Sequence, residues 1–153
     1  MSVSMIKPPV LIPPSRGKQV FLAGSIEMGS APNWQDEVAK ALGDTDLVLL
    51  NPRRDDWDSS WEQSIDNVEF RKQVEWELAG LEQADRIAMY FAPATKSPIT
   101  LLELGLFARH EKIILCCPEG FWRRGNVEVV AAAYNISLVS DLAALIEALR
   151  EFA

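Results

Sequence analysis

The chain alternates short runs of apolar residues with segments in which apolar residues recur every three or four positions. Runs of the first kind are typical of strands buried on both faces, and spacing of the second kind is typical of helices. This regular alternation predicts an α/β fold: a doubly wound, five-stranded parallel sheet with helices on both faces. Strands are predicted at residues 19–23, 47–50, 85–91, 112–117 and 136–139, and helices at 34–42, 68–82, 98–108, 127–133 and 142–152.

The size of the chain predicts one domain, because 153 residues with 48% hydrophobic side chains can bury a single core. Residues 1–17 hold four prolines and two basic residues but no long apolar run, which argues against a signal peptide or a membrane span. We interpret them as an extended proline-rich arm and residues 18–153 as a single domain. The adjacent Cys116 and Cys117 resemble core thiols of a reducing compartment, so a cytoplasmic protein is expected.

The net charge of −7 argues against a nucleic-acid polymer or an anionic membrane as the main partner, because the field of the protein would oppose binding. A single histidine and two adjacent cysteines do not have the spacing of a zinc site. The chain also lacks the glycine-rich motifs that hold dinucleotides or triphosphates. The expected partners are therefore small molecules, with no metal and no cofactor.

The helix predicted at residues 98–108 is apolar on almost every side. Ser97 is expected to cap it with its hydroxyl, and Pro98 suits the first helical position. Glu103 is the only ionisable side chain in this helix, and burying a carboxylate without partners is costly. Two interpretations are open. Glu103 is a structural acid that pairs with an arginine or caps a loop, or it is an acid that takes part in covalent or acid–base chemistry. Gly105 would let a strand or a ligand approach closely.

Ligands of such sheets bind beyond the carboxyl ends of the strands. Gly24, Ser25 and the loops at residues 51–61, 92–97 and 119–126 are all expected at this edge of the sheet. The loop at 92–97 leads into the helix of Glu103, which favours a functional role for this residue. Glycosyl transfer with retention needs one carboxylate that attacks the anomeric carbon and a second acid that protonates the leaving group. Glu77 is the best second acid, because it lies on a mostly apolar helix face.

The loop at residues 51–61 is longer than most connections in compact domains, and such loops often bind ligands. Its tryptophans, Trp57 and Trp61, are candidate stacking surfaces for a base. Arg53 and Arg54 either clamp a phosphate or balance the two aspartates that follow them.

The chain resembles the nucleoside 2-deoxyribosyltransferase family, in particular its shorter second branch. The resemblance extends from about Gln19 to Val130, and the segment around Glu103 is its most specific part. It rests on Phe21-Leu22-Ala23-Gly24-Ser25, Asn51-Pro52-Arg53-Arg54, Trp76-Glu77-Leu78 with Ala84-Asp85, the segment from Ser97 to Gly105, and Gly125-Asn126-Val127.

The resemblance implies a flavodoxin-like fold and the transfer of 2-deoxyribose between nucleobases through a covalent glycosyl-enzyme. Glu103 matches the nucleophile of the family, and Glu77 matches the acid that faces the nucleobase. Asn126 resembles an asparagine that a neighbouring subunit contributes, so a homo-oligomer with a shared site is implied. The substrate-binding residues expected from the resemblance and the loop positions are Gly24, Ser25, Ile26, Asn51, Arg54, Trp57, Ser97 and Asn126.

Ser97 departs from the better-known branch, which has an aspartate at this position for the sugar hydroxyls. Asp85 matches an acid at a strand start and is expected to be structural, and Trp34 is a third candidate stacking surface. Two other functions stay open: hydrolysis of the N-glycosidic bond of nucleosides or 5′-monophosphates, and nucleotide binding without catalysis.

Overall fold

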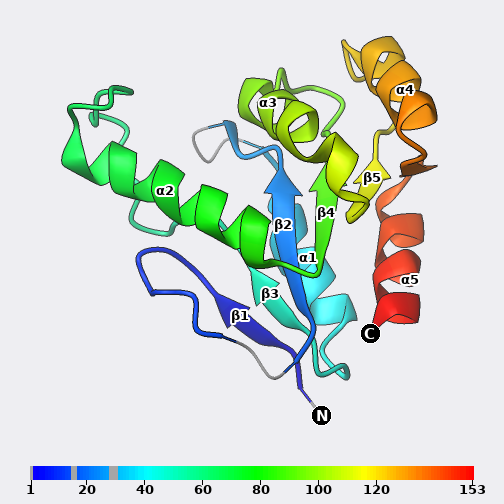
Figure 1. The fold of residues 1–153 in the computed structure, drawn as a ribbon, viewed down its shortest axis with the longest axis horizontal. Coiled ribbons are helices and arrows are strands. Elements are labelled where there is room, and N and C mark those ends of the chain that lie inside the picture. The colour runs from blue at the N-terminus through cyan, green and yellow to red at the C-terminus, as the bar shows by residue number, and fades with distance from the viewer. Residues whose placement is uncertain (1, 15–16, 28–30) are drawn as a thin grey trace.

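The computed structural model describes residues 2–14, 17–27 and 31–153. Within them the chain forms one parallel sheet of six strands in the order β1-β3-β2-β4-β5-β6. Figure 1 shows the strands running in one direction, with α3 near the arrowheads of β2 and β4. The strands are β1 (Ser4–Ile6), β2 (Gln19–Gly24), β3 (Val48–Leu50), β4 (Arg86–Tyr90), β5 (Ile113–Cys116) and β6 (Ser137–Val139).

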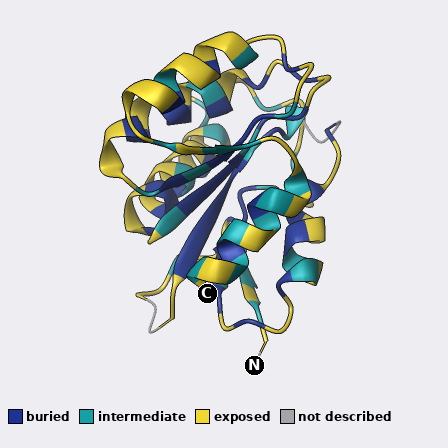
Figure 2. Ribbon diagram, turned by 90° about the vertical axis from the view of Figure 1, so that its right-hand side faces the viewer, coloured by how far each residue is buried: buried dark blue, intermediate teal, exposed yellow. Residues whose placement is uncertain are grey.

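The helices form a layer on each face of the sheet. Residues of α2, α3 and α4 pack into the hydrophobic cluster on one face, and residues of α1 and α5 into the cluster on the other. In Figure 2 the central strands are mostly buried, whereas the outer sides of the helices are exposed. The helices are α1 (Trp34–Ala41), α2 (Val68–Gln83), α3 (Pro98–Phe107), α4 (Arg124–Ala133) and α5 (Leu142–Phe152), and a 3₁₀ turn, η2 (Ala108–His110), follows α3.

The two core clusters follow directly from the pleat of the strands. Along β2, Phe21 and Ala23 belong to the cluster beneath α2 and α3, whereas Val20 and Leu22 belong to the cluster of α1 and α5. Because both faces are covered, the strand needs apolar residues at consecutive positions, as a continuous run provides. The flavodoxin-like α/β fold predicted from the sequence is confirmed.

The predicted number of strands is wrong by one, because β1 in the proline-rich arm joins the sheet. Ser4–Ile6 pairs in parallel with β3, with Met5 opposite Leu49. Three residues are too few to show a periodic pattern, and an edge strand gains its stability from the neighbour it pairs with. Part of the arm therefore belongs to the sheet.

The change of strand order lies between β2 and β4. The chain leaves β2 to form β3 on one side, and then crosses back to form β4 on the other. At the amino end of this pair, Asp85 is structural as expected, since its Oδ2 accepts a bond of 2.8 Å from the backbone N–H of Gln19. The carboxyl end is where sheets of this kind bind ligands. None of the described helices combines the length and apolar character needed to traverse a bilayer.

Two helical glycines allow a test of how tightly α2 packs on the sheet. A Cβ at Gly80 would lie 2.8 Å from the ring of Phe21, which is fully buried, whereas a Cβ at Gly105 meets nothing within 4 Å. The prediction that Gly105 admits a close approach by a strand is therefore wrong.

We expect Gly80→Ala to lower the free energy of unfolding by about 1–3 kcal/mol, because the overlap outweighs the helix propensity of alanine. Gly105→Ala is the matched control and should raise it by up to about 1 kcal/mol. Urea denaturation measures both. Equal effects of the two substitutions would contradict the packing of α2 on Phe21.

Candidate active site

Glu103 lies on the buried side of α3. Thr100, Leu104 and Phe107 share this side and are buried with it, and Glu103 itself is only 7% exposed. Within the described part of the chain, the structure shows no hydrogen bond or ion pair to its carboxylate. Burial raises the pKa of Glu103 to about 8, with the nearby charge of Glu77 adding to the shift. The carboxylate is thus held in the structure without the partners that a purely structural acid requires.

Glu77 lies on α2 and shares an electrostatic environment with Glu103 although 26 positions separate them in the sequence. It is half-buried, and burial raises its pKa to about 7, while the amide of Gln73 lowers it. Because both carboxyl groups have raised pKa values and the charge of Glu77 raises that of Glu103, the two do not both ionise easily at neutral pH. A nucleophile and a proton donor can therefore coexist here as one ionised and one protonated carboxyl group.

Gln73 was not singled out from the sequence, yet it joins Glu77 to the loop after β3. Its Nε2 donates 3.0 Å to the carbonyl of Pro52, and its Oε1 is buried without a partner among the described residues. A glutamine on a helix is usually solvent-exposed, so the sequence of α2 does not predict the contact between Gln73 and Pro52.

Ser97 does not cap α3 with its hydroxyl, so that prediction is wrong. Its Oγ instead lies 2.5 Å from Ser25 Oγ and 2.7 Å from Thr95 Oγ1, and Ser25 Oγ also accepts the N–H of Ala92 at 2.9 Å. All three hydroxyls are buried. Two predicted binding residues, Ser25 and Ser97, are thus brought together, and they join the end of β2 to the loop before α3.

The helix is capped instead by Glu27, which sequence reasoning missed. Its Oε1 accepts the backbone N–H groups of Lys96 at 3.1 Å and Ser97 at 2.7 Å. Pro98 occupies the first helical position as predicted. An acid in a loop is usually solvated, and only the folded loop shows that this one reaches a helix 70 residues later.

Gly24 ends β2 where another side chain would not fit. A Cβ there would lie 2.5 Å from both the ring of Trp34 and the carbonyl oxygen of Tyr90. Trp34 is buried against Tyr90 and donates to the carbonyl of Ser25 at 3.3 Å, so it belongs to the core and offers no stacking surface. Ile26, another predicted binding residue, is half-buried in the next turn.

Arg54 and Trp57 form one cluster with Trp61. The two indole rings meet edge to face at 5.0 Å, and the guanidinium of Arg54 lies 5.1 Å from the ring of Trp61. Arg54 also makes two bonds to Asp56, at 2.9 and 3.1 Å, which raise its pKa and lower that of Asp56. Its charge is therefore balanced within the loop. The Trp57 Nε1 is buried without a partner among the described residues, which leaves a donor for a ligand.

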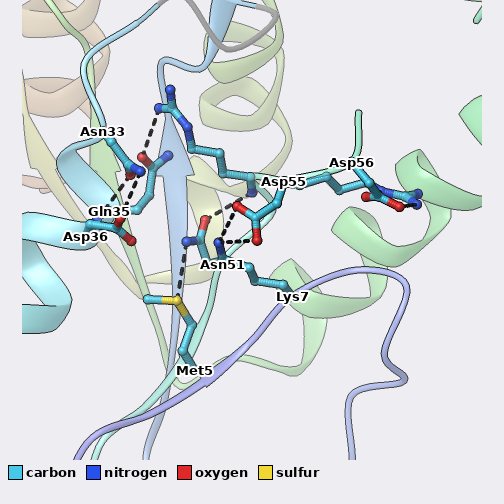
Figure 3. Close-up of polar contacts among 10 residues, drawn as sticks. Met5, Lys7, Asn33, Gln35, Asp36, Asn51, Asp55 and Asp56 are labelled. Atoms are coloured by element: carbon cyan, nitrogen blue, oxygen red, sulfur yellow. Dashed lines mark hydrogen bonds and ion pairs between the residues drawn. The ribbon is translucent and has the colours of Figure 1, made fainter. Parts of the chain in front are cut away.

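Asn51 is fully buried at the end of β3. Its Nδ2 lies 3.5 Å from the sulfur of Met5, and its Oδ1 accepts the N–H of Arg53 at 3.0 Å. Figure 3 shows the amide pointing toward Met5 and, nearby, the two bonds from Lys7 to Asp55. These contacts fix the turn that leads into the loop at residues 51–61.

Arg53 connects this turn to the loop before α1. Its guanidinium donates to the carbonyls of Ala31 at 2.9 Å and Pro32 at 3.2 Å, and to Gln35 at 3.5 Å. Arg53 thus bonds to backbone carbonyls and to Gln35, and Arg54 bonds to Asp56; a role of either toward a phosphate stays a prediction. The second interpretation of the arginine pair, charge balance by the aspartate that follows, therefore fits Arg54.

Asn126 is exposed in the first turn of α4. Two cavities of about 310 and 300 Å³ lie elsewhere, at the starts of the strands, lined among others by Arg86 and Ile113 or by Gln19 and Asp85. Neither includes Glu77 or Glu103. Among the described side chains, no group of three or more His, Cys, Asp or Glu is placed to hold a metal ion.

A comparison with family models decides where this chain belongs. The model described as "Nucleoside 2-deoxyribosyltransferase like" matches residues 17–121, which is more than half of the chain. The chain belongs to this family. The matched range contains Glu77, Glu103 and Glu27, whereas Asn126 lies beyond it.

Other comparisons concern the fold. The chain is similar to a solved structure described as "Crystal structure of conserved protein from Enterococcus faecalis V583", with a TM-score of 0.63 and 10% identical residues. The match covers 90% of this chain and 99% of that one. At such low identity it shows the shared fold alone. A comparison with curated proteins gives no match.

Proposed function

We propose that this member of the family transfers 2-deoxyribose between nucleobases. The observation that carries the proposal is the pair of carboxyl groups on α2 and α3, buried enough to raise both pKa values and close enough to influence one another. Family membership supports the same reaction class.

In the first step an oxygen of ionised Glu103 forms a bond to C1′ of the deoxynucleoside, and the N-glycosidic bond breaks. The bonding electron pair stays on the leaving base, which takes a proton from Glu77. A second base then attacks C1′, releases Glu103 and returns a proton to Glu77. The apolar surroundings place negative charge beside the cationic sugar of the transition state, where it stabilises most strongly.

The test incubates the protein with deoxyinosine, with and without free adenine, and follows the products by chromatography. We expect deoxyadenosine only when adenine is supplied. Free 2-deoxyribose at the same rate in both reactions would identify a hydrolase, because water would then intercept the glycosyl ester. No turnover in either reaction would leave a binding protein without catalysis.

We further propose that a second copy of the chain completes the site, as the exposed side of α3 suggests. Ile99, Leu102 and Leu106 are 58%, 59% and 50% exposed, although they lie on the helix that carries Glu103. Leu78, on the helix of Glu77, is 41% exposed. Large apolar side chains grouped in this way are typical of protein interfaces.

Replacing both Leu102 and Leu106 by aspartate should convert a homo-oligomer to monomers and lower transfer, because two charges would be buried at the interface. Light scattering after size exclusion measures the mass, and circular dichroism checks the fold. Leu11→Asp is the control, since Leu11 is 86% exposed on the proline-rich arm. A monomeric wild-type protein would contradict the proposal.

A further inference from the structure

We propose that Gln73 is a positioning residue of the transfer reaction: its amide nitrogen holds the carboxyl group of Glu77 in the orientation that delivers a proton to the leaving base. This inference rests on the proposed function, and it adds to the site a residue that acts through Glu77.

The amide of Gln73 is fixed from two sides. The side chain is buried, and its Nε2 donates 3.0 Å to the carbonyl of Pro52. Glu77 lies one turn further along α2, where side chains four positions apart are neighbours, and the same amide bonds to its carboxyl group. Because this bond lowers the pKa of Glu77, the amide is the donor. The two hydrogens of the nitrogen thus serve Pro52 and Glu77, one each.

The anchor at Pro52 belongs to a well-fixed turn after β3. Asn51, the residue before it, accepts the N–H of Arg53 with its Oδ1 at 3.0 Å and donates its own backbone N–H to the carbonyl of Ile6 at 2.9 Å. Both Asn51 and Pro52 are buried. The amide nitrogen of Gln73 therefore has a fixed reference point in the main chain, and Glu77 is held relative to that point.

The other atom of the amide, Oε1, is buried without a partner among the described residues. An unpaired buried acceptor costs about 1–3 kcal/mol, and an apolar side chain of similar size would avoid this cost. The position therefore carries an amide at the expense of stability. This favours a role for the nitrogen in the chemistry of Glu77 over a role in packing.

A donor beside Glu77 decides which of its two oxygens carries the proton. In a protonated carboxyl group one oxygen bears the hydrogen, and the other accepts. The oxygen that faces the N–H of Gln73 is the accepting one, so the hydrogen lies on the other oxygen. In the transfer step this O–H bond breaks, its electron pair stays on Glu77, and the proton passes to a nitrogen of the leaving base. Without Gln73 the carboxyl group could rotate, and proton transfer depends on a fixed geometry.

The charged groups around α2 leave this role to Gln73. On α3, Glu103 interacts with Glu77 through its charge. Beneath α2, β2 carries no charged side chain. Charged side chains of the neighbouring segments are engaged elsewhere: Lys7 with Asp55, Arg54 with Asp56, and Lys112 with the carbonyls at the end of α2.

The first experiment measures kcat/KM for transfer from deoxyinosine to adenine in Gln73→Met, which keeps the length of the side chain but removes the donor. We expect a fall of ~10–100-fold. Loss of the bond raises the pKa of Glu77 and so favours its protonated form, which by itself would increase activity between pH 7 and 8. A fall therefore reports lost orientation. Gln83→Met is the matched control: Gln83 donates 2.9 Å to the carbonyl of Pro13 near the end of α2, and its loss should change kcat/KM by less than ~2-fold.

A double-mutant cycle then tests whether Gln73 acts through Glu77. In the Glu77→Gln background, the further change Gln73→Met should alter the residual transfer by less than ~3-fold, because the group that it positions is already lost. A merely structural role would give the same loss in both backgrounds, and that result would overturn the inference.

A titration without substrate separates this inference from the proposed function. Carbon-13 NMR of labelled glutamate carboxyl groups should show Glu77 titrating near pH 7 in the wild type, and about 0.5–1 pH unit higher in Gln73→Met. The side-chain amide resonance of Gln73 should follow the same titration in the wild type, which tests the contact even if circular dichroism shows that Gln73→Met is unfolded.

The outcomes distinguish the two proposals. If no substrate turns over, the proposed reaction is wrong, and the titration alone decides whether Gln73 holds Glu77. An unchanged midpoint in Gln73→Met, an amide resonance that does not follow the titration, or transfer by Gln73→Met at the rate of the wild type would overturn the inference.

Discussion

Glu103→Gln is expected to lower deoxyribosyl transfer by at least ~10³-fold while leaving the protein folded. The amide cannot attack C1′, and it preserves the shape of the side chain. At alkaline pH the same substitution should stabilise the fold. The pKa of the Glu103 carboxyl group is about 8 in the folded protein, well above its value in an unfolded chain. The wild type therefore loses stability as pH rises from about 4.5 through 8.

At pH 8.5 the variant should exceed the wild type in unfolding free energy by at least about 1 kcal/mol, and the difference should shrink toward pH 5. Urea denaturation at both pH values measures it, and product chromatography measures transfer. Glu111→Gln, an exposed site after α3, is the control and should change neither property. A structural acid with partners would behave in the opposite way, because its replacement would destabilise the fold at pH 8.5.

The sequence was sufficient to single out Glu103 as a buried acid, because a lone carboxylate in an apolar helix has nowhere polar to face. The strands from β2 to β6 were predictable because each lies in an apolar run, although β3 and β6 are no longer than β1. β1 was not predicted, because Ser4–Ile6 lies in a proline-rich segment without such a run and takes its place by pairing with β3.

The start of α3 shows which parts of the site were beyond local reasoning. Ser97 has the residue type and position of a cap, and the sequence therefore predicts one. In the fold its hydroxyl is taken by Ser25 and Thr95, and Glu27 supplies the cap from another loop. Contacts between residues 70 positions apart depend on how β2 and β4 are placed in the sheet. Rules for helix capping use only neighbouring residues in the sequence, so they cannot predict such contacts. Likewise, Asn51 and Arg54 are tied to neighbours in the described chain, and their predicted roles toward substrate stay predictions.

The pH dependence of transfer is expected to be a narrow bell with its maximum between about pH 7 and 8. The productive state has Glu103 ionised and Glu77 protonated, so the pair must carry one proton. Because the pKa of Glu103 is the higher of the two, this proton lies mostly on Glu103, and the productive state is the minor form of the singly protonated pair; its population still reaches its maximum between the two pKa values. Burial raises the pKa of Glu77 to about 7 and, with the charge of Glu77, that of Glu103 to about 8. Below this range both groups hold protons and no nucleophile is available; above it both are ionised and the leaving base receives no proton.

Glu77→Gln tests this assignment, because it removes the proton donor and the repelling charge together. We expect kcat/KM to fall by about 10²–10⁴-fold. The alkaline limb of the profile should disappear, and the remaining activity should rise with pH to a plateau, because the variant keeps only Glu103 as a titrating group, with a pKa below about 8 once the charge of Glu77 is gone. Glu75→Gln is the matched control on the same helix: Glu75 is exposed and pairs with Arg71 at 3.3 Å, so its loss should leave the bell intact. A Glu77→Gln enzyme that keeps both limbs would show that the second proton belongs to another group.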